Sequence, residues 1–219
     1  MLEKIGTAGF ETLSTTDTVV LNYLDEVLAE NPGPTIYEIG VGIGATTLPM
    51  MERLNHQGQA YLFSRQSDLD ALTADLRERG FANMNGTWGS PNNTYSGYHF
   101  ELARAFVEEA LPPFDLAYID GGHVFHLDGP ATCILKELCK PGGYMIFDDW
   151  YWSLGKSPTL NPTKQPNTAR DYDPLQIEAS HVQLVCKAFM DRDIRFEFVE
   201  LAKNTAVYRR LPDDLPLPS

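Results

Sequence analysis

Basic residues are scarce in this 219-residue sequence. It contains 17 lysine and arginine residues against 30 aspartate and glutamate residues, so its formal net charge is −13. Proteins that bind nucleic acid present a basic surface to the phosphates, and anionic membrane surfaces attract clusters of lysine and arginine. The sequence contains no such cluster. We therefore expect neither nucleic acid nor a membrane as a partner.

Long apolar runs and cysteine pairs are also lacking. No segment approaches the roughly 20 apolar residues of a membrane-spanning helix. The N-terminus, residues 1–6, has no basic stretch followed by an apolar one, so no signal peptide is expected. The three cysteines, Cys133, Cys139 and Cys186, are far apart and odd in number. They predict reduced thiols, not disulfides or a zinc site, and hence a cytoplasmic protein.

Short apolar segments alternate with segments of helical periodicity along most of the chain. This alternation predicts one α/β domain over residues 1–219, with a mostly parallel sheet and helices on both of its faces. Two apolar segments around Ala202–Asn204 predict an antiparallel hairpin at the end. Strands are expected at 35–40, 60–63, 81–88, 114–119, 144–147, 195–201 and 205–208. Helices are expected after 14–17, at 45–54, 68–79, 98–111 and 175–190, and from Gly129-Pro130 onward.

An acidic residue and three glycines follow the first predicted strand. Glu38, Gly40, Gly42 and Gly44 form the pattern Glu-x-Gly-x-Gly-x-Gly. Ligands of open parallel sheets bind beyond the carboxyl ends of the strands, and glycine lets the backbone turn sharply and approach a ligand. The dinucleotide pattern, Gly-x-Gly-x-x-Gly, is different. A carboxylate before the glycines favours a cationic ligand over a pyrophosphate.

Carboxylates follow two further predicted strands. Asp120 ends one strand, and Asp148 and Asp149 end the next. Because parallel neighbours end at the same edge of a sheet, we expect the three side chains to lie close together. Clustered carboxylates raise one another's pKa unless a cation joins them, and oxygen ligands suit Mg²⁺. The pattern predicts a site for Mg²⁺ or another divalent cation. The alternative is that Asp148 caps the following turn while Asp149 is solvated.

A histidine lies three residues after Asp120. His123 is on the predicted loop, and an imidazole can accept a proton from a hydroxyl group near neutral pH. We therefore interpret His123 as a catalytic base. His126 is an alternative base, and a third interpretation gives His123 only a hydrogen bond to the backbone. We expect His181 to be an ordinary surface residue.

The segment 151–174, called the lid segment below, interrupts the alternation of strands and helices. It contains four prolines and shows no periodicity. Loops of this length inside a domain are usually functional or disordered. The segment directly follows the acidic pair and contains Trp152 and Tyr172, so we predict a lid over the site. A disordered insertion is the alternative.

The combination of the glycine motif, the Pro141-Gly142-Gly143 turn before a strand and the terminal hairpin resembles the class I S-adenosylmethionine-dependent methyltransferases. The resemblance implies a seven-stranded, Rossmann-like sheet and S-adenosylmethionine as cofactor. In that family an acid at the end of the second strand binds the ribose; here Ser64 stands there, which predicts weaker binding. Ser90 or Asn92 takes the place near the adenine. The resemblance assigns the cofactor to Glu38, Gly40, Gly42, Gly44, Ser64, Ser90 and Asp120.

The carboxylates resemble those of the metal-dependent O-methyltransferases, of the catechol type and of the macrolide-sugar (mycinamicin and macrocin) type. In both, an aspartate ends the fourth strand and an acidic pair ends the fifth. The base three residues after the first aspartate is a histidine in the mycinamicin type, as His123 is here. The resemblance implies Mg²⁺-dependent methylation of a hydroxyl on a small molecule, for example in natural-product biosynthesis.

Two other functions stay open at this point. In a metal-independent methyltransferase, the carboxylates would only bind the substrate. In a methyltransferase fold that serves as a binding subunit, catalysis would be lost, and Ser64 in place of an acid favours that possibility. A homo-oligomer is also compatible with the sequence.

Overall fold

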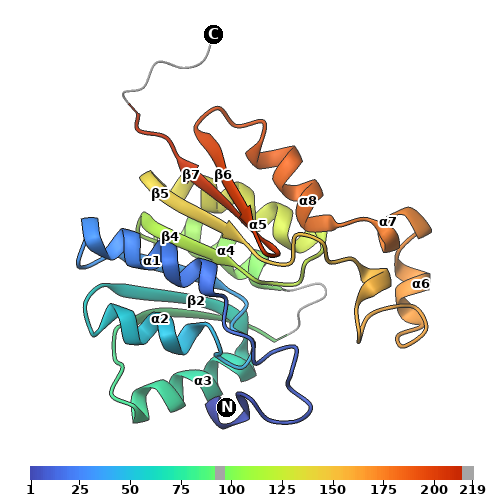
Figure 1. Ribbon diagram of the computed structural model, residues 1–219, viewed down its shortest axis with the longest axis horizontal. Coiled ribbons are helices and arrows are strands. Elements are labelled where there is room, and N and C mark those ends of the chain that lie inside the picture. The colour runs from blue at the N-terminus through green and yellow to red at the C-terminus, as the bar shows by residue number, and fades with distance from the viewer. Residues whose placement is uncertain (92–96, 214–219) are drawn as a thin grey trace.

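A seven-stranded sheet forms the centre of the protein in the computed structural model, which describes residues 1–91 and 97–213 (Figure 1). The strand order is β3-β2-β1-β4-β5-β7-β6. Strands β1 to β5 pair in parallel, whereas β7 is antiparallel to both β5 and β6. This arrangement confirms the predicted fold, including the terminal hairpin. The strands are β1 (Thr35–Ile39), β2 (Gln59–Arg65), β3 (Met84–Ser90), β4 (Phe114–Ile119), β5 (Cys139–Phe147), β6 (Phe196–Ala202) and β7 (Thr205–Arg210).

Helices cover both faces of the sheet. On one face α1, α2 and α3 pack over a core that includes Ile36 and Leu62, and on the other α4, α5 and α8 pack over Tyr37 and Phe63 (Figure 1). Both faces are buried, so most residues of the inner strands are apolar. In the described part of the chain, no helix is both long and apolar enough to cross a membrane. The helices are α1 (Thr18–Glu30), α2 (Thr47–Leu54), α3 (Gln66–Glu78), α4 (Tyr98–Val107), α5 (Phe125–Leu138), α6 (Asn167–Asp171), α7 (Pro174–Glu178) and α8 (His181–Val185).

Helix α1 begins where the sequence predicts. The carboxylate of Asp17 accepts hydrogen bonds from the backbone N–H groups of Val19 at 2.7 Å and Val20 at 3.4 Å. Such a cap satisfies N–H groups that have no partner within the helix. The other oxygen of Asp17 accepts a bond from Thr205 Oγ1 at 2.7 Å, so the same carboxylate ties α1 to β7.

Helix α5 begins at Phe125, four residues before the predicted start at Gly129-Pro130, and Pro130 lies inside it. The early start depends on a distant partner, because Nδ1 of His181 accepts the N–H of Phe125 at 3.1 Å. Nε2 of His181 lies 2.7 Å from the carbonyl oxygen of Gln176. His181 is thus buried between α5 and α7, with 4% of its surface exposed, and the prediction of a surface histidine was wrong.

The predicted helix 175–190 is divided into three pieces. Helix α7 ends at Glu178, α8 begins at His181, and a π-helical turn, Cys186–Met190, follows. The break lies at Ser180, whose hydroxyl donates a 2.6 Å hydrogen bond to the carbonyl oxygen of Trp150. That hydrogen bond holds Ser180 next to the residues that follow β5. The chain therefore does not continue as one helix from α7 into α8.

The lid segment contains regular structure that the sequence did not predict. A 3₁₀ turn, Leu154–Lys156, and helix α6 lie within it. Ser157 and Thr168 are buried, and the Thr168 hydroxyl donates a 2.6 Å bond to the carbonyl oxygen of Leu160. Residues within the lid segment therefore contact one another, and the segment lies beside the carboxyl ends of the strands (Figure 1). Its role as a lid stays a prediction.

Candidate functional site

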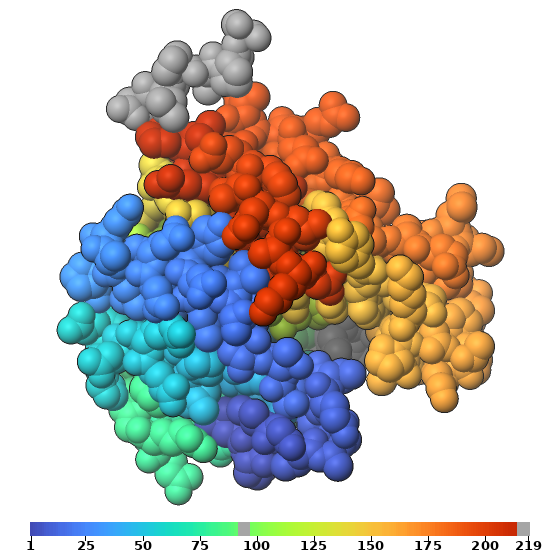
Figure 2. Space-filling view, viewed as in Figure 1, coloured from blue at the N-terminus to red at the C-terminus, as the bar shows by residue number. Residues whose placement is uncertain are grey.

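Strands β1, β4 and β5 end side by side, and backbone hydrogen bonds continue past their last residues. The N–H of Asp120 donates to the carbonyl oxygen of Ile39 at 2.8 Å, and the N–H of Asp148 donates to that of Ile119 at 3.0 Å. The residues that follow the three strands therefore share one edge. Figure 2 shows a hollow between the N-terminal residues, in dark blue, and the lid segment, in gold.

The glycine turn, residues 40–44, leaves β1 with positive φ angles. Gly40 has φ +85°, and a Cβ there would lie 2.0 Å from the carbonyl oxygen of Asp120, so this position has room only for glycine. Gly42 has φ +50°, but a Cβ there would meet no atom within 4 Å. The structure therefore needs Gly40 for its own packing, whereas Gly42 borders open space. A ligand cradle has this property.

Glu38 lies beneath the glycine turn. Only 2% of its surface is exposed, and within the described residues Oε2 has no hydrogen-bond partner. Burial raises the pKa of Glu38 to about 8, because the charged form loses its hydration, and the neighbouring Thr47 hydroxyl offsets only part of this effect. A buried carboxyl group with a free oxygen fits a ligand that carries a positive charge. The S-adenosylmethionine assigned by resemblance is such a ligand.

Ser64 and Ser90 lie at neighbouring strand ends, as expected. Ser64 pairs with Gly89 in the register of β2 and β3, and Ser90 pairs with Arg65. Both serines are buried. Asn92, the alternative to Ser90, lies outside the described residues. Both serines therefore lie near the carboxyl ends of their strands, but they are one register position apart, so their side chains point to opposite faces of the sheet.

The structure brings together the three carboxylates that the sequence selects, called the acidic cluster below. The hydroxyl of Tyr118 lies 3.3 Å from Asp120 Oδ2 and 3.2 Å from Asp148 Oδ2. Burial raises the pKa of Asp120 well above its usual value, and repulsion from Asp148 and Asp149 raises it further. The pKa of Asp148 is also raised, by burial and then by Asp149. Crowded negative charge of this kind is relieved when a proton or a cation neutralises it.

His123 lies between two members of the acidic cluster. Its Nε2 is 3.4 Å from Asp120 Oδ1 and 3.4 Å from Asp149 Oδ2. Within residues 1–91 and 97–213, no three or more His, Cys, Asp or Glu side chains are grouped closely enough to hold a metal ion. The donor chemistry fits a hard divalent cation, since all three carboxylates offer oxygen. A cation held by these carboxylates would compete with the imidazole of His123 for the oxygens of Asp120 and Asp149.

The hairpin turn between β6 and β7 supplies partners that the sequence did not reveal. Asn204 Nδ2 donates a 2.9 Å hydrogen bond to Asp149 Oδ1. The hydroxyl of Thr205, which donates to Asp17, lies 3.3 Å from Asp148 Oδ1. Asp149 is therefore not merely solvated. No local spacing signals these contacts, because they join residues more than 50 positions apart.

Aromatic side chains of the lid segment contact both candidate bases. The ring of Trp152 is centred 5.5 Å from that of His123, and the ring of Tyr172 is centred 6.1 Å from that of His126. Trp152 and Tyr172 also pack against the core beneath. The beginning of the lid segment therefore lies beside the loop that carries His123, and its end lies beside His126 in the first turn of α5.

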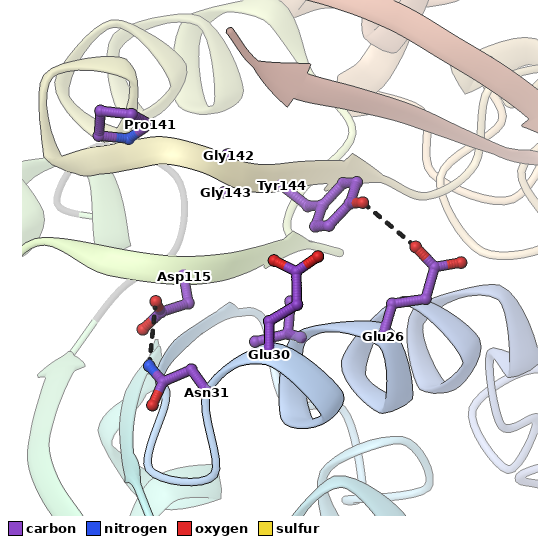
Figure 3. Close-up of a pocket in the computed structure, with 9 residues that line it drawn as sticks. Glu26, Glu30, Asn31, Asp115, Pro141, Gly142, Gly143 and Tyr144 are labelled. Carbon is purple, nitrogen blue, oxygen red and sulfur yellow. Dashed lines mark hydrogen bonds between the residues drawn. The ribbon is translucent and has the colours of Figure 1, made fainter. Parts of the chain in front are cut away.

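A separate pocket opens at the opposite edge of the sheet (Figure 3). It lies between α1 and the first residues of β4 and β5, where Asn31 donates to Asp115 at 3.3 Å and Tyr144 donates to Glu26 at 3.2 Å. None of the site residues predicted from the sequence lines it, although Pro141, Gly142 and Gly143 do. The candidate site therefore rests on the carboxyl edge and not on this pocket.

Comparison with protein families gives one match. The model of a family described as a methyltransferase domain matches residues 37–150, just over half of the chain. The match includes the glycine turn, the acidic cluster and His123. Comparison with curated proteins gives no match.

Several solved structures share the fold at low sequence identity. An O-methyltransferase from Bacillus cereus, in complex with SAH, has 13% identity and a TM-score of 0.65, with 96% of this chain and 90% of that chain covered. The O-methyltransferase TomG from Streptomyces achromogenes, in complex with SAM, has 14% identity and a TM-score of 0.61, with coverages of 96% and 89%. MycE from the mycinamycin biosynthetic pathway, in complex with Mg and SAH, has 20% identity and a TM-score of 0.56; 90% of this chain matches 51% of that one.

Proposed function

Since this chain belongs to the methyltransferase-domain family, we propose that it transfers the methyl group of S-adenosylmethionine to a hydroxyl oxygen of a small molecule, with Mg²⁺ or another divalent cation at the acidic cluster. The observation that carries this proposal is the meeting of the glycine turn, the acidic cluster and His123 at one sheet edge. The acceptor is a hydroxylated small molecule, such as a natural product, and the enzyme is cytoplasmic.

The cofactor proposal rests on Glu38 and Gly42. Glu38 is a buried acid with an unpartnered oxygen, and S-adenosylmethionine carries positive charge that such a group would favour. Gly42 leaves the neighbouring space open. Gly40 and Gly44 continue the turn, and Ser64, Ser90 and Asp120 would complete the contacts at the adjoining strand ends. The SAM or SAH in TomG and in the Bacillus cereus enzyme supports the choice of ligand.

Methyl transfer is an in-line displacement at a sulfonium carbon, so the protein must align two reactants and exclude water. His123 would accept the proton of the acceptor hydroxyl, because its Nε2 lies at the acidic cluster. Asp120, Asp148 and Asp149 would hold a cation, which would lower the pKa of a hydroxyl group bound to it. The lid segment would cover the acceptor, with Trp152 beside His123.

A metal-independent methyltransferase is the second candidate. The contact between His123 and two carboxylates favours it, because a carboxylate can orient an imidazole and stabilise its charged form without a metal. In that case the acidic cluster supports the base directly. Dependence of turnover on a divalent cation separates the two candidates.

The test is a methyl-transfer assay with S-adenosylmethionine and small hydroxylated probes, among them 1,2-dihydroxybenzene and methyl glycosides. We expect O-methylated product, loss of turnover in excess chelator and its return with Mg²⁺. Full turnover at negligible metal content would select the second candidate. Calorimetry that detects no S-adenosylmethionine binding would contradict both and would favour a binding subunit.

The lid can be tested independently of turnover. Limited proteolysis should cut the lid segment more slowly when S-adenosylmethionine and a hydroxylated probe are both present. Cleavage at the same rate with and without these ligands would argue against a lid. The same samples, analysed by sedimentation, report whether the protein forms a homo-oligomer.

A further inference from the structure

Tyr98 and Asp128 form a buried pair behind the loop that carries His123. Tyr98 is the first residue of α4, Asp128 lies in the first turn of α5, and 5% and 2% of their surfaces are exposed. The hydroxyl of Tyr98 donates a hydrogen bond to Asp128 Oδ1. The same hydroxyl accepts the backbone N–H of Gly122 at 2.9 Å. Two helices are thus connected to the chain between Asp120 and His123.

The contact with Tyr98 restricts the backbone conformation of the loop 121–123. A Cβ at Gly121 would lie 2.4 Å from the Tyr98 hydroxyl, so the tyrosine packs directly against the backbone of the loop. His123 has φ +52°, a left-handed conformation that is unfavourable for a residue other than glycine. Such a conformation persists only where the surroundings impose it. The bond from Gly122 to Tyr98 lies immediately before this position.

The core does not need these polar groups for its packing. A buried carboxyl group costs stability unless its oxygens are hydrogen-bonded, and burial raises the pKa of Asp128. Apolar residues of similar size would fill the same space without that cost. Tyr98, held by Asp128, forms a directed hydrogen bond with the backbone N–H of Gly122, which an apolar residue cannot do.

We infer that Tyr98 and Asp128 are positioning residues, which hold the loop 121–123 so that Asp120 and His123 face the acceptor. Neither side chain touches the reacting atoms, since both are buried behind the loop. The inference rests on the proposed function, because it assigns the pair a role in the alignment of that reaction. Misplacement of a catalytic group by about 1 Å can lower a rate by roughly 10²-fold.

The main test is Tyr98→Phe, which keeps the ring in the core and removes the hydroxyl. We expect kcat for a hydroxylated probe to fall about 10- to 100-fold, whereas the Kd for S-adenosylmethionine and the KM for the probe change by less than about threefold. Asp128→Asn keeps the size of the partner and should lower kcat in the same direction. It replaces Tyr98→Phe as the decisive variant if the latter does not fold.

Tyr208→Phe is the matched control. Tyr208 is also buried, with 1% exposure, and its hydroxyl donates to an aspartate, Asp191, at 2.7 Å. This pair belongs to β7 and the segment after α8, and among the residues that the structure describes no hydrogen bond joins it to residues 120–123. The control should lose similar stability and keep kcat within about twofold of the wild type.

Hydrogen exchange at the Gly122 amide gives a second measurement that does not depend on turnover. We expect faster exchange there in Tyr98→Phe and unchanged exchange in Tyr208→Phe. Equal kcat in the two tyrosine variants, or unchanged Gly122 exchange in Tyr98→Phe, would overturn the inference. Failure of the wild type to methylate any probe would contradict the proposed function instead, and the exchange result would then decide whether the pair holds the loop.

Discussion

The side-chain amide of Asn204 donates a 2.9 Å hydrogen bond to Asp149. Asn204 also accepts two backbone N–H groups, that of Tyr151 at 2.9 Å with its side-chain oxygen and that of Trp150 at 2.8 Å with its carbonyl oxygen. The hairpin turn thereby fixes both the second carboxylate of the acidic pair and the first residues of the lid segment. Asp149 has φ +57°, so its backbone conformation also depends on such support.

Asn204→Ala should therefore weaken both the fold and the cation site. Loss of two side-chain hydrogen bonds should lower the free energy of unfolding by about 1–2 kcal/mol. Loss of a residue that orients Asp149, a proposed metal ligand, should lower Mg²⁺ affinity about 10-fold or more. Urea unfolding and calorimetry with Mg²⁺ measure the two effects.

Asn31→Ala is the control for that variant. Asn31 also makes two side-chain hydrogen bonds, with Asp115 at 3.3 Å and with the N–H of Gly33 at 3.0 Å, but at the opposite edge of the sheet. It should lose comparable stability and keep its Mg²⁺ affinity. Equal Mg²⁺ affinity in the two variants would show that Asn204 has no special relation to the site.

Gly40→Ala and Gly42→Ala should separate folding from cofactor binding. The methyl group at position 40 meets the carbonyl oxygen of Asp120, so we expect Gly40→Ala to unfold or to lose several kcal/mol. Gly42→Ala has free space and should cost only about 1 kcal/mol, for the φ angle of +50°. It should nevertheless lower S-adenosylmethionine affinity at least 10-fold in calorimetry. Unchanged S-adenosylmethionine affinity in Gly42→Ala would show that the cofactor does not bind at the glycine turn.

Glu38 should make the ligand-free protein less stable as the pH rises. Its pKa is raised from 4.5 to about 8 by burial, so the folded state holds a proton that the unfolded state releases. Between these values the free energy of unfolding should fall by up to about 1.4 kcal/mol per pH unit. Glu38→Gln cannot ionise and should lack this part of the slope. Parallel slopes for the two proteins in urea unfolding would exclude a protonated Glu38.

Local sequence determines much of this fold. The apolar residues Ile36, Tyr37 and Ile39 and the glycines after them predict a buried strand and a ligand turn, because both features depend on neighbouring residues alone. The start of α5, by contrast, does not depend on neighbouring residues alone. Gly129-Pro130 has the local signature of a helix start, but the real start at Phe125 depends on the acceptor nitrogen of His181, 56 positions away.

The candidate site shows the same limit. The residues after strand ends, such as Asp120 and Asp148, could be selected because parallel strands end together. Their partners Tyr118 and Thr205 could not, since a tyrosine within β4 or a threonine at the start of β7 has the pattern of any strand residue. Only the folded sheet brings these hydroxyl groups to the carboxylates.

Asp120→Asn should stabilise the cation-free protein while it abolishes function. The pKa of Asp120 is raised in the folded protein, so ionisation of this carboxyl group opposes folding. The folded state is therefore most stable with Asp120 protonated, and this stability is lost as the pH rises through the folded-state pKa. Asparagine cannot ionise, so the melting temperature at neutral pH without Mg²⁺ should rise by a few degrees. Mg²⁺ should stabilise the wild type but not the variant. A lower melting temperature for Asp120→Asn would contradict mutual repulsion in the acidic cluster.

His123→Ala should lower kcat about 10²- to 10⁴-fold, which is the usual contribution of a positioned base, with cofactor affinity nearly unchanged. His126→Ala is the control, because His126 lies next to Tyr172 and outside the acidic cluster; it should keep kcat within a few-fold. Near-normal kcat in His123→Ala would assign the base to His126 or to a metal-bound hydroxide.

The position of β7 between β5 and β6 sets the order in which the protein can be completed during synthesis. A ribosome delivers β1 to β5 and the whole acidic cluster well before residues 205–210. Until those residues emerge, the nascent sheet has an open edge at β5, and Asp148 and Asp149 lack Thr205 and Asn204. An open strand edge is prone to pair with other chains. Translation must therefore pass residue 210 before the nascent chain can close its sheet and assemble a competent site.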